Sequence, residues 1–343
     1  MRIPHSKPTS PFCLASLAVF RPLFRAALRF GALLLAFGCG GLPAQEVPRP
    51  NRAVGFQILP EPLPDGKGAW GLEVSSQFLR PSFERSGDGR TFARLDGEEW
   101  QFTGDLPLPL GPGSLNLRVR VNHRGGGIFD QVIGTWHSLL ATPGGGRELA
   151  PKYHIEYALV RDGVTVARLD HAATQLMDLD LAYVVPFGTN QKGGRLGLGV
   201  QLPTGRQEDF SGSGGTDWTL GGAAWRTWGR LRVHGQAERI RIGLPADSPY
   251  RRVMDRSQIS RAWLGCGWHG EGAGFWSGLG IDVTLAYQGS PYALGIVRID
   301  RAGWQQHWTF SHSRFPQWRF SFSEEAGSYM APDITGALIY RFR

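Results

Sequence analysis

The strongest constraint on the fold is a period-two alternation of apolar and polar residues, sustained over unusually long segments. In residues 274–288, Leu279, Ile281 and Val283 alternate with small or polar residues such as Gly280 and Asp282. Successive side chains of a β-strand point to opposite faces, so this segment predicts a strand with one apolar and one polar face. Such segments exceed the roughly five or six residues of typical globular strands, which favours strands that cross a membrane.

Twelve segments of this kind can be placed between glycine-rich or charged turns. They cover residues 69–79, 92–104, 113–123, 175–187, 194–202, 216–227, 230–242, 258–269, 274–288, 304–313, 317–324 and 333–343. Tight turns, the first of them at 107–112, alternate with long loops at 124–174, 203–215, 243–257 and 289–303. Short turns on one side and long loops on the other are typical of outer-membrane barrels.

The expected fold class is therefore all-β, a closed antiparallel transmembrane β-barrel of about 12 strands, because an open sheet in lipid would leave an unpaired edge. Tryptophans near the proposed turns support this fold, since a membrane interface favours that residue. These tryptophans are Trp100, Trp225, Trp228, Trp268, Trp304 and Trp318.

The first 44 residues have the pattern of an export signal. Five basic residues precede an apolar run at residues 30–37, and no acidic residue occurs before Glu46. A basic region followed by a short apolar region is typical of a removable signal peptide. We expect cleavage after Ala44, with lipidation at Cys39 as the alternative. The predicted organisation is a signal peptide at 1–44, a proline-rich N-terminal lead-in at 45–67 and the barrel at 68–343.

Removal of the signal changes the charge of the chain. It takes away five of the 37 basic residues and none of the 29 acidic ones, so the net charge falls from +8 to +3. A nucleic-acid-binding protein needs a basic patch or stripe, so we expect no nucleic acid partner. Cys266 is the only cysteine after residue 44, which excludes an intramolecular disulfide in the mature chain. We expect no metal and no cofactor.

The C-terminal strand carries the clearest assembly motif. Leu338, Tyr340 and Phe342 alternate on the face predicted to contact lipid. A terminal aromatic residue after such an alternation resembles the signal read by the barrel-assembly machinery, although Arg343 follows it here. We therefore expect the outer membrane of a Gram-negative cell as the location. The expected partners are outer-membrane lipid, lipopolysaccharide, the assembly machinery and a small-molecule cargo of unknown identity.

Several ordered motifs resemble an uncharacterised family of bacterial outer-membrane β-barrels, the domain of unknown function 3187. They are GGGIFDQVIGTWHSLLATPGGGR at 125–147, LPTG at 202–205, SGSGGTDWTLG at 211–221, FSEE at 322–325 and APDIT at 331–335. The resemblance spans roughly residues 50–343. It implies a barrel fold and an outer-membrane location, and it implies no reaction, because the family has no established activity.

Apolar residues recur at helical spacing in residues 128–140 of the longest loop. This spacing predicts one short helix in a long extracellular loop. The helix either folds into the barrel as a constriction that contacts a hydrophobic ligand or caps the outer rim. The candidate constriction or ligand contacts are Phe129, Val132, Ile133, Trp136 and His137.

Charged residues on the polar faces of the strands are candidates for the barrel lumen. They are Glu98, Arg118, Arg120, Arg195, Asp282, Arg319, Asp333 and Arg341. If the arginines pair with carboxylates, they stiffen the wall, and if they are unpaired and line water, they favour anions.

These features favour a channel or passive transporter for small solutes or hydrophobic compounds. One alternative is a non-conducting structural or ligand-binding barrel, which a lumen filled by residues 46–67 would favour. The other is a surface lipid-modifying hydrolase. No GxSxG, HExxH or phosphate-loop pattern occurs, and His137 and Ser138 would point about 100° apart on a helix. We therefore predict no catalytic residues.

Overall fold

A computed structural model describes residues 59–64, 71–126, 135, 154–270, 278–325 and 334–341. The regular structure in these residues is almost entirely β, and every strand pairing is antiparallel. The strands are β1 Gly71–Arg85, β2 Phe92–Leu110, β3 Gly113–Gly125, β4 Glu156–Arg161, β5 Val164–Leu169, β6 Ala173–Leu176, β7 Leu179–Gly188, β8 Lys192–Leu202, β9 Asp217–Trp228, β10 Leu231–Arg241, β11 Gln258–His269, β12 Leu279–Gln288, β13 Gly303–His312, β14 Trp318–Glu325 and β15 Ile334–Arg341. The predicted all-β antiparallel class is confirmed.

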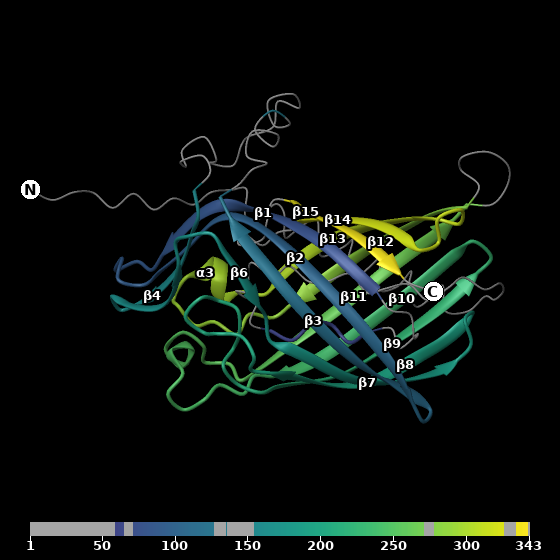
Figure 1. Ribbon diagram of the computed structural model, residues 1–343, viewed down its shortest axis with the longest axis horizontal. Coiled ribbons are helices and arrows are strands. Elements are labelled where there is room, and N and C mark those ends of the chain that lie inside the picture. The colour runs from purple at the N-terminus through teal and green to yellow at the C-terminus, as the bar shows by residue number, and fades with distance from the viewer. Residues whose placement is uncertain are drawn as a thin grey trace, which may run out of the picture.

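Most of these strands pair in a continuous ring. The order around the ring is β1, β2, β3 and then β7 through β15, and β15 pairs back with β1. In this last pairing Gly71 lies opposite Arg341 and Phe78 lies opposite Ile334. Figure 1 shows the strands wrapped obliquely around a common axis, with β1 beside β15. The first and last strands of the sheet in chain order, β1 and β15, are therefore neighbours in space.

The sheet has more strands than predicted. Each of the twelve predicted segments overlaps one strand of the ring, but the described residues form fifteen strands in one sheet. The additional strands β4 and β5 lie in the segment predicted as the loop 124–174, and β6 spans the end of that loop and the start of the predicted strand 175–187. β4 extends the sheet by pairing with Phe92–Asp96 at the start of β2, and β6 pairs with Val121–Arg124 at the end of β3. Asp162 and Gly163, both with positive φ, form the turn between β4 and β5.

The first tight turn is shorter than predicted. β2 continues through Pro107 and Pro109 to Leu110, which pairs with Gly113. Only Gly111 and Pro112 remain for the turn, and the φ of +57° at Gly111 explains why a glycine occupies it. The prolines therefore lie inside a long strand rather than in a turn at 107–112.

Among the described side chains of the ring, most polar ones point inward and most exposed apolar ones point outward. Along β3 the even-numbered residues Ser114 to Arg124 are buried, while the odd-numbered residues between them are partly or fully exposed. Arg120 is only 1% exposed, whereas Leu196 and Leu220 on β8 and β9 are 62% and 64% exposed. This is the reverse of the arrangement in a protein that folds in water. Trp225 was predicted near a membrane interface, but it is buried.

Apolar residues gather at the end of the ring that carries the long loops. The cluster includes Leu159, Val166, Phe210, Tyr250 and Tyr292, which come from β4, β5 and three different loops. A 3-10 helix η2 (Pro249–Arg252) and a short helix α3 (Val297–Asp300) contribute to it. The loops at this end are therefore packed into a compact cap with its own core, and Figure 1 shows α3, β4 and β6 together there.

Two predicted segments lie outside the described residues. They are the signal peptide at 1–44 and the loop helix at 128–140, of which only residue 135 is described. Among the described residues, no helix is both long and apolar enough to span a bilayer.

Candidate functional site in the ring interior

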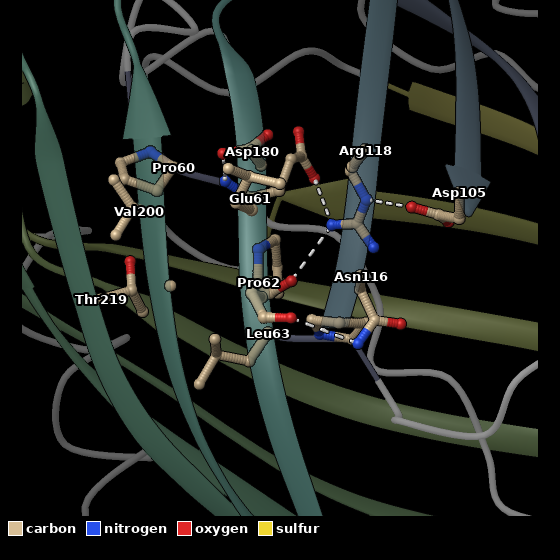
Figure 2. A pocket seen from close by; sticks show the side chains of 14 residues that line it. Pro60, Glu61, Pro62, Leu63, Asp105, Asn116, Arg118, Asp180, Val200 and Thr219 are labelled. Atoms are coloured by element: carbon tan, nitrogen blue, oxygen red, sulfur yellow. Dashed lines mark hydrogen bonds and ion pairs between the residues drawn. The ribbon is translucent and has the colours of Figure 1, made fainter. Parts of the chain in front are cut away.

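The interior of the ring is occupied by a segment of the chain itself. Residues 59–64 precede β1, and the side chains of Leu59, Glu61 and Leu63 are buried. Figure 2 shows this segment, hereafter the inner segment, lying against β3, β7 and β8, with Glu61 directed toward Arg118. The segment belongs to the proline-rich lead-in that was predicted to be irregular.

Side chains of the wall satisfy the backbone of the inner segment. The carbonyl oxygen of Pro60 accepts a hydrogen bond from Arg261, and that of Glu61 accepts one from the same guanidinium at 3.1 Å. The carbonyl of Pro62 accepts from Arg118 at 3.1 Å. The amide of Leu63 donates to Glu238 at 2.8 Å, and that of Glu61 donates to Asp180 at 3.4 Å. The two prolines have no amide hydrogen, so residues 60–63 bring only two donors that need partners.

The carboxylate of Glu61 lies between two arginines of β3. Its Oε1 accepts a hydrogen bond from Arg120 at 3.1 Å, and its Oε2 lies 3.8 Å from Arg118. Arg118 also pairs with Asp105 on β2, and Arg120 pairs with Asp180 on β7 at 3.1 Å. Both guanidinium groups are thus held by carboxylates of the wall and by a carboxylate of the inner segment.

A second ion pair faces the inner segment from β10 and β11. Arg261 donates to Glu238 at 2.6 Å, and both side chains are almost completely buried. Arg195 on β8 joins this group by donating to Gln236 at 2.6 Å. Because an unpaired charge buried away from water is costly, these pairs fix the geometry around the inner segment.

The apolar side chains of the inner segment have their own contacts. Leu59 packs with Ile240, Ile242 and Ile259 at the loop end of β10 and β11. Leu63 lies over Gly197 and Gly199 on β8, where an added Cβ would come within 3.0 and 3.3 Å of its methyl groups. Glycine at these two positions therefore leaves room for Leu63 beside the wall.

A small cavity of about 20 Å³ remains between the inner segment and the wall. Its lining includes Pro62, Asn116, Arg118, Asp180 and Thr219. This volume has room for about one water molecule, so the inner segment itself fills most of the space beside these residues.

The structure places the predicted lumen charges as follows. Arg118, Arg120, Arg195 and Asp282 are buried on the inward face. Glu98 is buried as well, but it alternates with Glu99, which lies opposite the inward-facing Arg124, so Glu98 belongs to the other face of β2. Asp282 accepts hydrogen bonds from Thr284 at 2.8 Å and contacts His234 at 2.9 Å. Arg319 is half-buried on β14. Asp333 and the side chain of Arg341 lie outside the described part of the structure. Of this set, Arg118 and Arg120 contact the inner segment.

The predicted constriction residues Phe129, Val132, Ile133, Trp136 and His137 also lie outside the described residues. In the assembly motif, Leu338 is exposed on the outer face, and the ring of Tyr340 lies 4.7 Å from that of Trp318. Phe342 lies outside the described residues. Within the described ranges, no group of three His, Cys, Asp or Glu side chains is arranged to hold a metal ion.

Sequence reasoning missed Glu61, Asp180, Glu238 and Arg261 as members of the site. Three of them lie on strands that were predicted at nearly the observed positions, so extending the inward alternation along each strand would have found them. Glu61 had no such signal, because its segment has neither a helical nor a strand period.

The sequence model of a family described as a protein of unknown function, DUF3187, matches residues 82–237. The predicted family resemblance is confirmed. The DUF3187 match is shorter than the expected span of 50–343. It covers the strands from β2 to β9, which contribute Arg118, Arg120 and Asp180, and it ends within β10 before Glu238.

Solved structures similar to the chain are outer-membrane proteins. The COG4313 outer membrane channel from Pseudomonas putida F1 has 11% sequence identity and a TM-score of 0.49, covering 83% of this chain and 98% of its own. The NanC porin has 7% identity and a TM-score of 0.42, with 79% and 99% covered. The CymD monoaromatic hydrocarbon channel has 9% identity and a TM-score of 0.34, with 89% and 95% covered. No curated protein is significantly similar to the chain.

Proposed function

We propose that this protein is a transmembrane β-barrel of the bacterial outer membrane that acts as a channel for small solutes or hydrophobic compounds. The reversal of polar and apolar faces around the ring carries this proposal. Leucines that are more than half exposed, such as Leu196 and Leu220, alternate with buried polar groups of the same strands. A lipid bilayer solvates such an outer face, while the hydrogen-bonded ring leaves no strand edge in the hydrocarbon.

This placement assigns the two ends of the barrel to different compartments. The short turns, such as Gly111–Pro112, would face the periplasm, and the cap around Tyr250 and Tyr292 would face outward. In this proposal, lipid and lipopolysaccharide surround the barrel, the assembly machinery inserts it, and residues 1–44 direct its export. The segment 125–147 remains a candidate constriction at the outer end.

Among the residues that the structure describes, the inner segment is the element that narrows the channel. Recording conductance in planar bilayers tests this role with the mature chain, the double variant E61Q/L63A and a variant lacking residues 125–147. The double variant weakens the contacts of the inner segment with Arg120 and with the glycines of β8. We expect its conductance to rise several-fold above that of the wild-type chain. Deletion of 125–147 should raise conductance only if that segment is a second constriction.

A non-conducting ligand-binding barrel is the second candidate function. The inner segment filling the interior and the pairing of Arg118, Arg120 and Arg261 with carboxylates favour it. Heat-modifiable electrophoretic mobility shows whether each of the three proteins is folded. If all three are folded and none conducts in bilayers, the ligand-binding barrel replaces the channel as the function.

A further inference from the structure

The contacts of the inner segment are those of a bound ligand rather than of a strand. None of its backbone hydrogen bonds to the wall described above joins a strand backbone, because each partner is a side chain of Arg118, Asp180, Glu238 or Arg261. These side chains come from four strands, β3, β7, β10 and β11, of which only β10 and β11 follow each other in the chain. A wall that presents converging buried side chains to a short extended peptide is built like a binding site.

The charges of the wall define what this site accepts. If the inner segment leaves, Arg120 loses the carboxylate of Glu61, Arg118 loses the carbonyl of Pro62, and Arg261 loses two carbonyl oxygens. All three guanidinium groups are buried. A buried donor that loses its acceptor is costly, so an occupant that replaces the segment must supply acceptor oxygens to Arg118 and Arg120. Both guanidinium groups keep their carboxylate partners on the wall, and a carboxylate of the occupant would take the place of Glu61 beside them.

The remaining contacts of the inner segment define the apolar part of an occupant. Leu63 fills a space floored by Gly197 and Gly199, and this space becomes free only when the inner segment leaves. An occupant that satisfies both parts has a carboxylate at one end and a small apolar group at the other. Arginine pairs well with carboxylates because its donors match their two oxygens.

We propose that the ring interior holds a binding site for small amphipathic carboxylic acids, and that residues 60–63 occupy it as an internal ligand. Glu61 supplies the carboxylate and Leu63 the apolar group. This inference deepens the proposed channel function by naming the class of solute. A tethered segment competes at an effective concentration of about millimolar, so an external acid binds well only when the segment is weakened.

Fluorescence anisotropy tests this site in detergent with a labelled peptide, acetyl-Leu-Pro-Glu-Pro-Leu-Pro-amide, which copies residues 59–64. The proteins are the wild-type chain and the full-length E61Q/L63A variant. We expect the peptide to bind the variant at least about tenfold more tightly than the wild-type chain, since the variant lacks one charge-assisted hydrogen bond and one apolar contact. Hexanoate should displace the peptide, and hexanol at equal concentration should not.

Two matched controls isolate the carboxylate and the wall. A peptide with glutamine in place of its glutamate should bind E61Q/L63A at least about tenfold more weakly, because it lacks the charge. Adding R120Q to the variant should weaken binding of the original peptide, whereas adding R239Q should not, because Arg239 is exposed on the outer face of β10.

The proposed site would be wrong if folded E61Q/L63A does not bind the peptide, or if it binds the two peptides equally well. Displacement by hexanol as effective as that by hexanoate would overturn its carboxylate specificity. These measurements do not require conduction. If the peptide binds but the protein does not conduct, the binding site is retained and the channel is rejected. If the protein conducts but the peptide does not bind, the channel is retained and the binding site is rejected.

Discussion

Arginine defines the interior of this protein at the scale of single residues. Arg118, Arg120, Arg124 and Arg261 are all buried on inward faces, and each pairs with a carboxylate of a neighbouring strand or of the inner segment. Removing one partner of a buried ion pair leaves an uncompensated charge, at a cost of about 3–5 kcal/mol, whereas replacing both with apolar residues is often neutral. The pairs therefore act as units.

The pair formed by Arg261 and Glu238 gives the first prediction. R261M should lower the free energy of unfolding by about 3 kcal/mol or more, because it leaves Glu238 buried without its guanidinium. R261M/E238M should recover part of that loss, because it removes the uncompensated charge but also the partners of the inner-segment backbone. Urea unfolding in micelles measures both, with R239Q as a control expected within about 0.5 kcal/mol of the wild-type chain. Additive losses in the double variant would show that the two residues act separately.

Asp178 gives a prediction of pH dependence. Burial raises its pKa, although its carboxylate accepts hydrogen bonds from the amides of Gly205 and Ser213. A carboxyl group whose pKa is higher in the folded state stabilises the fold below its unfolded pKa of about 4 and loses that contribution as the pH rises through the folded value. D178N should therefore lose less stability than the wild-type chain between pH 4 and pH 7.

Unfolding midpoints measured at both pH values check this prediction. The exposed Asp255 provides the matched control, since D255N should follow the wild-type dependence. Parallel curves for D178N and the wild-type chain would show that Asp178 does not contribute.

The sequence predicted inward residues well where the strand period was regular and poorly elsewhere. Arg118, Arg120, Arg195 and Asp282 alternate within long strands, so their burial follows from local geometry. The interior position of Glu61 depends on contacts with residues at least 57 positions away, beginning with Arg118, and no local pattern encodes those contacts.

Among the elements, the seam between β1 and β15 is the one that completes the ring. β15 also pairs with β14, where Trp318 lies opposite Tyr340 and their rings are in contact. Tyr340 therefore contributes to the outer surface where β15 meets β14. Together with Phe342, it forms the aromatic part of the predicted assembly signal.

Substitution of these aromatic residues tests that signal. Y340D/F342D should block assembly and leave a protease-sensitive species in the periplasm, because aspartates on the lipid-facing side oppose insertion. The conservative variant Y340F/F342Y should assemble normally. Surface labelling with protease accessibility measures both, and normal surface levels of the aspartate variant would contradict the prediction.

Elements outside the ring were harder to predict than those inside it. The hairpin of β4 and β5 pairs with an extension of β2 that lies beyond the pairing with β3, and β6 is only four residues long. Such pairings depend on where a loop returns to the sheet. The period-two alternation that located the ring strands carries no information about that return path.

At the scale of the whole molecule, the exposed apolar surface distinguishes a membrane protein from a soluble one. Leu196, Leu198 and Leu220 lie side by side on β8 and β9, and each is about half exposed or more. A contiguous apolar surface of this kind is rare on monomeric soluble proteins. This surface supports the proposed placement in a lipid bilayer, which solvates apolar side chains.

Arginine substitution on that surface tests the membrane placement. L220R should reduce the fraction of protein that inserts and folds in lipid vesicles, because arginine near the bilayer centre costs about 2–4 kcal/mol. L220M should insert like the wild-type chain. Heat-modifiable electrophoresis measures the folded fraction. Equal insertion of the two variants would contradict the proposed placement, since an exposed site in water tolerates arginine.

The location of the inner segment limits the order in which the parts of each molecule can assemble. Residues 59–64 precede β1 in the chain, yet β1 and β15 close a hydrogen-bonded wall on every side of them. The segment is therefore either wrapped by strands that gather around it or threaded through a mouth after the seam has formed. In the first case the barrel strands assemble around the inner segment, and formation of the seam between β1 and β15 then traps that segment inside.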